Sequence, residues 1–157
     1  MQQALAAATA IQDEYSRANA LSALADKLPP ELLQQALAAA TAIQSERYRA
    51  NALSALADKL PSELLQQALA AATAIQDEYS RANALSALAD KLPPELLQQA
   101  LAAATAIQSE RYRANALSAL ADKLPSELLQ QALAAATAIQ DEYSRANALS
   151  ALADKLP

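Results

Sequence analysis

Apolar residues recur at spacings of three and four in two kinds of segment that alternate along the whole chain. In the first kind, covering residues 32–43 in one copy, the apolar positions are Leu32, Leu33, Ala36, Leu37, Ala40 and Ile43. The second kind of segment runs from Ser45 to about Lys59. Its apolar positions are Ala50, Leu53, Leu56 and Ala57, together with Leu60 directly after it. These spacings gather side chains on one face of an α-helix. The pattern therefore predicts pairs of short amphipathic helices.

The residues that flank these segments predict where each helix begins and ends. Pro30 suits the first helical position because its missing N–H costs nothing there, and Glu31 interacts favourably with the helix dipole. Ser45, which is Asp13 in alternate copies, supplies the side-chain oxygen expected at the N-cap of the second helix. Pro61 cannot continue that helix and ends it.

The pair of helices returns every 32 residues, giving units 2–33, 34–65, 66–97, 98–129 and 130–157. Neither helix of a unit can bury its apolar face alone, so stacked copies must share a continuous core. We expect an all-α fold with a single repeat domain over residues 1–157. It is an α-solenoid of five two-helix repeats, with ten antiparallel helices and a right-handed superhelix favoured over a left-handed one.

The copies differ at four positions, and they differ in strict alternation. Copies 1, 3 and 5 (the A copies) share the residue types that copy 1 has at Asp13, Tyr15 and Ser16, and copies 1 and 3 also share Pro30. Copies 2 and 4 (the B copies) have the types found in copy 2 at Ser45, Arg47, Tyr48 and Ser62. The module is thus a 64-residue pair. Alternation without drift indicates an engineered gene, or else a very recent natural amplification, and we favour engineering because consensus repeats are readily designed.

The amino-acid composition excludes most kinds of metal-binding, redox and nucleotide-binding site. The chain has no Gly, no Cys and no His. Without thiolate or imidazole it lacks the ligands that zinc, haem and iron–sulfur clusters prefer, and it forms no disulfide. Without glycine it lacks the loops that cradle nucleotide phosphates. We expect no cofactor, no metal and no catalytic residue.

Charge and hydropathy bear on which classes of partner the chain can bind. The net charge of −5 and the absence of a basic stripe disfavour nucleic acid. The longest uncharged stretch, residues 32–45, is too short to span a bilayer and contains three glutamines. No basic region precedes an apolar run at the N-terminus, so no secretory signal is predicted. We expect a soluble chain without membrane contact that stays in the cytoplasm when expressed recombinantly.

The closest pair of acidic residues, Asp13 and Glu14, does not predict catalysis. Adjacent side chains on a helix point about 100° apart and cannot share a proton. An N-cap and a first-turn acid account for them, with Asp13 expected to reach Arg17 one turn on. The serines Ser22 and Ser54 have no histidine to activate them.

The tyrosines form the one distinctive pattern of side chains. There is one per copy, and its position shifts by one residue between A and B copies. Equivalent positions give one row of Tyr15, Arg47, Tyr79, Arg111 and Tyr143, beside a second row that contains Tyr48 and Tyr112. A guanidinium placed near a neighbouring ring would add a cation–π interaction. These rows predict an inter-repeat contact that sets packing, and the alternative is a ligand-binding ladder, since Tyr and Arg are favoured at hot spots.

Two families of helical repeats are similar to this unit. Tyr15, Ala18, Ala25 and Pro30 follow the spacing of the aromatic, small, small and proline positions of tetratricopeptide repeats. The segment Ala38 to Pro61 resembles helical repeat arrays appended to bacterial signalling ATPases of the NACHT and STAND type. Both resemblances imply an α-solenoid whose relatives bind peptides or proteins, and neither implies a catalytic residue.

The two ends of the array carry apolar residues that an interior copy would cover. We expect partial exposure of Leu5, Ile11 and Leu21 at one end and of Leu149, Leu152 and Leu156 at the other. Such complementary ends stack head to tail into filaments or close into a ring. The leading hypothesis is a non-enzymatic engineered scaffold, or a self-assembling building block whose partner is itself. The alternative is a peptide- or protein-binding module derived from a bacterial sensor array.

Overall fold

The computed structural model describes residues 1–157 and contains ten α-helices and no strand. The chain divides into two compact units, Met1–Leu88 and Ala89–Pro157. The first unit holds α1 (Gln2–Thr9), α2 (Glu14–Ala25), α3 (Pro30–Thr41), α4 (Glu46–Ala57), α5 (Ser62–Thr73) and all but the last residue of α6 (Glu78–Ala89). The second holds α7 (Pro94–Thr105), α8 (Glu110–Ala121), α9 (Ser126–Thr137) and α10 (Glu142–Ala153). The fold class is the predicted one, an all-α repeat solenoid.

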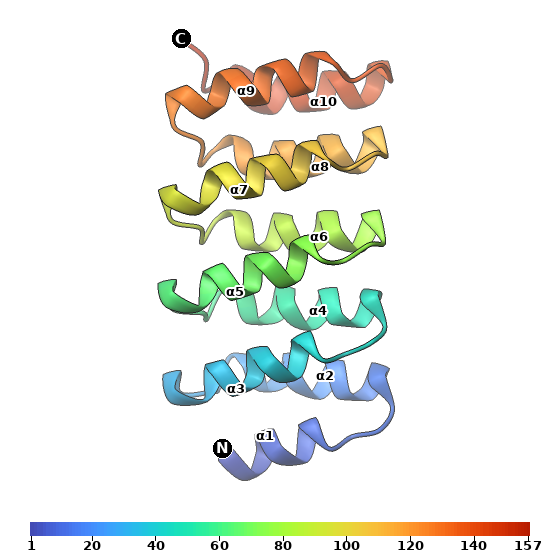
Figure 1. Ribbon diagram of the computed structural model, residues 1–157, viewed down its shortest axis with the longest axis vertical. Helices are drawn as coiled ribbons and strands as arrows, with labels where there is room; N and C mark the ends of the chain where they lie inside the picture. The colour runs from blue at the N-terminus through green and yellow to red at the C-terminus, as the bar shows by residue number, and fades with distance from the viewer. The chain divides into compact units, whose positions relative to one another are not determined.

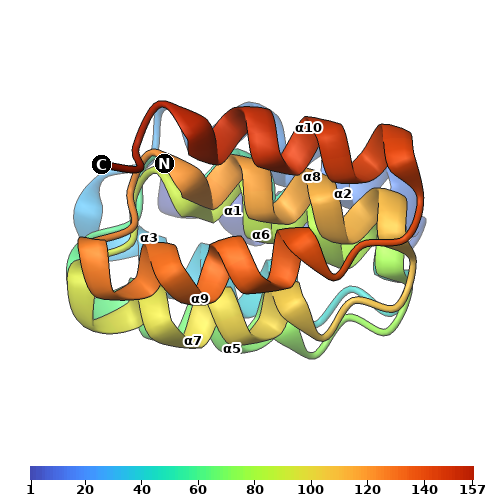
Figure 2. The same ribbon diagram turned by 90° about the horizontal axis from the view of Figure 1, so that it is seen from above.

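In each unit the helices form two layers, one of odd-numbered and one of even-numbered helices (Figures 1 and 2). In the first unit α4 packs along α2, and in the second α10 packs along α8. The odd-numbered helices contact each other less extensively, for example α3 with α1 and α9 with α7. Short turns such as residues 10–13 and 26–29 make successive helices antiparallel.

The helix starts follow the sequence signals. Asp13 caps α2, with its carboxylate accepting a hydrogen bond from the backbone N–H of Ser16 at 2.9 Å. Ser45 caps α4 in the same way through the N–H of Tyr48, at a longer 3.5 Å. Pro30 begins α3 as predicted. The second helices end at Ala57 and its equivalents, two residues before the expected Lys59.

The core consists of leucine, isoleucine and alanine from both layers. Ala36, Leu37, Ala40 and Ile43 of α3 and its turn are buried, as are Leu53 and Leu56 of α4. Two details differ from the expected faces. Leu32 is only half-buried, whereas Ala52, which the predicted stripe of α4 omitted, is completely buried. Its small side chain lets α4 lie close to its neighbours.

The ends of the array expose less apolar surface than the sequence indicated. Leu5, Leu21 and Leu152 are buried, so the expectation that they would be exposed is wrong. Each has an adjacent copy on the side that it faces, because the equivalents Leu133, Leu149 and Leu24 are partly exposed at the other end of the array. Ile11, Leu149 and Leu156 are partly exposed, as expected. Leu24 and Leu133, which the prediction did not name, are also partly exposed. No helix of the fold is both long and apolar enough to cross a bilayer.

Candidate functional site at the repeat junctions

Glutamates at the start of three of the second helices bind the turn of the following repeat. The carboxylate of Glu14 accepts hydrogen bonds from the backbone N–H groups of Gln44 and Ser45, at 2.5 and 3.0 Å. The same geometry recurs between Glu46 and the amides of Gln76 and Asp77 at 2.7 and 3.0 Å. It recurs in the second unit between Glu110 and the amides of Gln140 and Asp141, at 2.7 and 2.9 Å. We call Glu14, Glu46 and Glu110 the junction glutamates.

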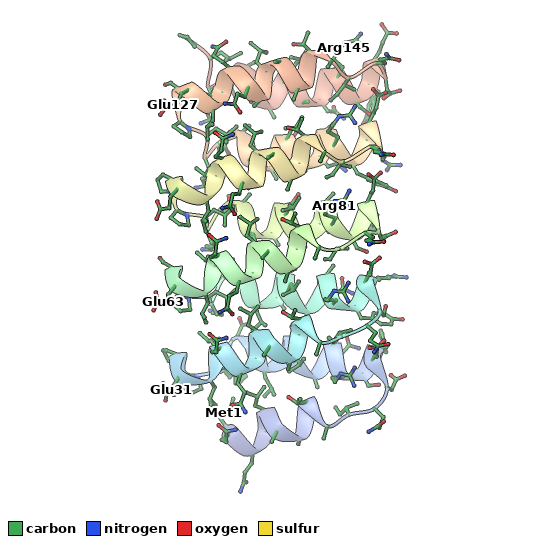
Figure 3. All side chains as sticks on the ribbon, viewed as in Figure 1. Met1, Glu31, Glu63, Arg81, Glu127 and Arg145 are labelled. Atoms are coloured by element: carbon green, nitrogen blue, oxygen red, sulfur yellow. The ribbon has the colours of Figure 1, made fainter.

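An arginine holds each junction glutamate in place and completes the turn. Arg49 donates to Glu46 at 3.3 Å, to the carbonyl of Ile43 at 2.6 Å and to the carbonyl of Gln44 at 3.3 Å. The carbonyls of Ile43 and Gln44 lie in the turn between α3 and α4, outside the hydrogen-bond ladder of either helix. The guanidinium fork of Arg49 satisfies those carbonyls while it orients the carboxylate of Glu46. Figure 3 shows the equivalent Arg81 at the edge of the first unit opposite Glu31 and Glu63.

These hydrogen bonds lower the pKa of several carboxyl groups. The backbone amides of Gln140 and Asp141 hold the pKa of Glu110 below its ordinary value. Hydrogen bonds from Ser80 lower the pKa of Asp77, and the bond from the hydroxyl contributes more than the bond from the backbone amide. Ser144 lowers the pKa of Asp141 in the same way. Hydrogen bonds to an ionised carboxylate favour its charged form, and this is the direction of every shift. The carboxylates therefore act as permanent acceptors at neutral pH, which is the opposite of an acid poised to donate a proton.

Side-chain contacts between adjacent repeats also line the outer edges of both layers. In the odd layer, Gln34 donates to Gln67 at 3.0 Å. Equivalent pairs join Gln2 to Gln35 and Gln98 to Gln131. At the ends of the even helices, Lys59 pairs with Asp26 at 3.7 Å, and Lys155 with Asp122 at 3.5 Å. The lysine–aspartate pairs are exposed and contribute little to stability, but they add direction to the junction.

The structure brings two of the predicted Tyr and Arg row residues together as a ring pair. The rings of Tyr15 and Tyr48 lie edge to face with centroids 5.4 Å apart and planes at 65°. The contact thus joins tyrosines of the two predicted rows, one from an A copy and one from the following B copy. Arg47, Arg111 and Tyr79 are exposed, and Tyr112 is half-buried.

Tyr143, the last tyrosine of the row, is the most exposed, at 77%. The serines of the second row differ in burial: Ser80 and Ser144 are 2% and 4% exposed, whereas Ser16 is exposed. The second row thus faces the preceding repeat, which covers Ser80 and Ser144. Ser16 is exposed because it lies in the first repeat.

Sequence reasoning missed the junction glutamates because their partners lie 30 and 31 residues away. It interpreted Glu14 as a first-turn acid and Asp13 as an N-cap that also reaches Arg17. The N-cap is confirmed, but the contact with Arg17 is wrong: Arg17 pairs with Glu14 at 3.2 Å, and Asp13 accepts from Ser16 instead. One signal was available. Glutamate occupies this position in A and B copies alike, whereas the N-cap beside it changes from Asp to Ser.

Two shallow grooves lie between odd helices. One, between α1 and α3, is lined by Ala6, Thr9, Ala10, Gln35, Ala38 and Ala39. The other, between the first turns of α7 and α9, is lined by Pro94, Glu95, Gln98, Pro125, Glu127 and Leu128. The chain places no three His, Cys, Asp or Glu side chains close enough to hold a metal ion.

Comparison with known proteins adds no family to this description. No protein-family model, no curated protein and no solved structure matches the chain.

Proposed function

We propose that the chain is a non-enzymatic repeat scaffold, built from an engineered or consensus module, that assembles with further copies of itself. The observation that carries this proposal is the reuse of one set of polar contacts at successive junctions. Glu14, Glu46 and Glu110 each bind two backbone amides of the next repeat. The charged side chains that another protein would use on a ligand are used here to join copies.

The state of the carboxylates supports a structural role. An enzyme that transfers protons at neutral pH raises the pKa of an acid or leaves a base free to accept. Here the pKa of Asp77 and of Glu110 is lowered by hydrogen bonds from neighbouring N–H and O–H groups. No histidine or cysteine accompanies them. Both of these acceptors are already bonded within the scaffold.

The test is light scattering coupled to size-exclusion chromatography over a wide concentration range. The scaffold proposal predicts a mass above 16.4 kDa that rises with concentration for an open filament, or stays at a fixed multiple for a closed ring. A mass of one chain at every concentration would contradict self-assembly.

A second function, binding an extended peptide, is favoured by the groove between α1 and α3. Its walls are alanines, with Gln35 and Thr9 offering hydrogen bonds at the rim. The resemblance to tetratricopeptide and sensor arrays points the same way. A screen of displayed peptides against the wild type and an Ala39→Arg variant tests it. A peptide retained by the wild type and lost by the variant supports binding in the groove, and equal retention contradicts it.

A further inference from the structure

The last repeat presents a junction glutamate that has no amides to bind. Glu142 is equivalent to Glu14, Glu46 and Glu110, yet its side chain is 92% exposed and its only contact is Arg145 at 3.8 Å. The corresponding Glu46 and Glu110 side chains are each 30% exposed. Figure 3 shows Arg145 at the edge of the second unit opposite Glu127. Glu142 thus has the position and charge of an internal junction residue but lacks its partners.

The first repeat presents the complementary donors. The backbone N–H groups of Gln12 and Asp13 occupy the turn that Gln44 and Ser45 occupy in the second repeat. In the second repeat both amides are bound by Glu14. In the first repeat neither donates a hydrogen bond within the chain. The carboxylate of Glu142 and the amides of Gln12 and Asp13 are therefore the two halves of the contact that recurs at the internal junctions.

Two further polar pairs and an apolar patch also have one half at each end of the array. Asp154 and Lys27 are equivalent to the internal pair Asp122 and Lys155, and both are exposed. Gln130 and Gln3 are equivalent to the internal pair Gln98 and Gln131. Around them the partly exposed Leu133 and Leu149 belong to one end of the array, and Ile11 and Leu24 to the other. Both end surfaces thus combine polar groups in matching positions with an apolar patch.

From these surfaces we infer that a second copy of this chain binds head to tail, with Glu142 of one copy accepting from the backbone amides of Gln12 and Asp13 of the next. Lys27 then pairs with Asp154, and Gln3 accepts from Gln130. This inference rests on the proposed function and names the atoms that form its interface. The end surfaces carry the same groups, in the same register, as the internal junctions. Another copy of the chain can therefore make all four contacts at once, whereas an unrelated protein would not present the matching groups.

The intermolecular junction differs from the internal ones in one respect. The repeats that hold Tyr143 and Ser16 are both A copies, so in this junction Tyr143 meets Ser16 of the next chain. At the internal junction from A to B, the tyrosine pair Tyr15 and Tyr48 lies edge to face instead. The wild-type junction therefore lacks a ring contact that the scaffold can provide. Ser16→Tyr gives the first repeat the second-row tyrosine of a B copy and supplies the missing ring.

The experiment is sedimentation equilibrium of the full chain at several concentrations, for the wild type, Glu142→Gln, Ser16→Tyr and Glu127→Gln. Glu127→Gln removes the same charge from the first turn of α9, the helix that precedes α10, at the edge opposite Arg145. We expect Glu142→Gln to weaken association roughly tenfold, because it removes charge-assisted hydrogen bonds from a partly solvated site. We expect Ser16→Tyr to tighten association by about two- to tenfold. Glu127→Gln should leave it unchanged.

The outcomes separate this inference from the proposed function. A wild type that associates, with Glu142→Gln matching Glu127→Gln and Ser16→Tyr matching the wild type, keeps self-assembly but overturns the head-to-tail junction. Single chains at all concentrations for the wild type and for Ser16→Tyr overturn both. Because Glu142, Ser16 and Glu127 are exposed, circular dichroism melts should be nearly superimposable for all four proteins. A variant that melts far below the others is replaced by Asp154→Asn, which must weaken association if the junction is correct.

Discussion

The carboxylate of Glu46 accepts a hydrogen bond from the backbone amide of Asp77, 31 residues later, at 3.0 Å. This bond ties the start of one second helix to the N-cap of the next. It directs a negative charge at the amino end of α6, where unpaired N–H groups favour anions. The side chain of one repeat therefore performs part of the capping of the following repeat. Neighbouring repeats are coupled through backbone atoms, whose positions do not depend on which A or B side chains surround them.

Removing the charge of a junction glutamate should destabilise the array. Glu46→Gln keeps the size of the side chain but offers one neutral oxygen where two charged ones bind Gln76 and Asp77. We expect the free energy of unfolding to fall by about 1–2 kcal/mol, since hydrogen bonds to charged groups exceed neutral ones. Urea denaturation measures it. Glu63→Gln, an exposed first-turn acid of α5, is the control and should change stability by less than about 0.5 kcal/mol. Equal losses would contradict the role of Glu46.

Arginine should not be replaceable by lysine at the turn. Arg49→Lys keeps the charge but cannot bond the Ile43 carbonyl and the Glu46 carboxylate at once through a planar fork. We expect a loss of about 1 kcal/mol in the free energy of unfolding. Arg47→Lys, on the exposed face of the same helix, should have little effect. If both substitutions lower the urea midpoint equally, helix propensity rather than the fork explains the loss.

Acid should destabilise the protein, and neutral to mildly alkaline pH should not. Hydrogen bonds lower the pKa of Asp77 from its ordinary 3.8 and that of Glu110 from its ordinary 4.5. A carboxyl whose pKa is lower in the folded state stabilises the fold above its unfolded pKa, and this contribution is lost as pH falls through the folded pKa. The chain has no histidine to titrate between these groups and neutrality. Urea midpoints should be constant from pH 8 to about pH 6 and fall below pH 4.5.

The acid sensitivity should be partly removed by Asp77→Asn. This variant should be less stable than the wild type at pH 7 and should lose less stability on acidification, because one of the titrating groups is gone. Parallel curves for the two proteins from pH 7 to pH 3 would show that Asp77 does not contribute.

Equivalent leucines should differ in their cost of truncation. Leu53 is 1% exposed, whereas Leu149, at the same position of the last repeat, is partly exposed. We expect Leu53→Ala to lower the free energy of unfolding by about 2–5 kcal/mol, through lost burial and the cavity left behind. Leu149→Ala should cost clearly less, since its neighbours and water can fill the gap. The comparison isolates position, because the local sequence is the same apart from the A or B residues.

The ring pair should be energetically coupled. A double-mutant cycle with Tyr15→Leu and Tyr48→Leu measures the interaction between the two rings apart from their separate burial. We expect a favourable coupling of about 0.5 kcal/mol, the low end for aromatic pairs, because Tyr15 is 56% exposed. A cycle between Tyr15 and Arg47 should give a smaller value. A larger coupling for Arg47 would favour the cation–π arrangement that the sequence indicated.

Local signals in the sequence determined the helices. Pro30 at a first helical position, the caps Asp13 and Ser45, and the spacing of leucines each act within one or two turns of chain. Their outcome depends on backbone geometry that is the same in every protein, so the elements and the repeat could be predicted. The solenoid followed because neither helix of a unit can be buried alone.

The contacts between copies were decided only by the tertiary structure. Whether Tyr48 meets Tyr15 or an arginine depends on rotation and translation between adjacent helices, and shifts of a few ångströms change the partner. The same holds for Glu14, whose carboxylate had an adequate local role beside the helix dipole until the fold placed the amides of Gln44 and Ser45 next to it. The burial of Leu5, Leu21 and Leu152 likewise depends on which side of each helix the adjacent repeat covers. A sequence fixes interactions within a few residues by covalent connection, whereas those between repeats await the packing that brings distant residues together.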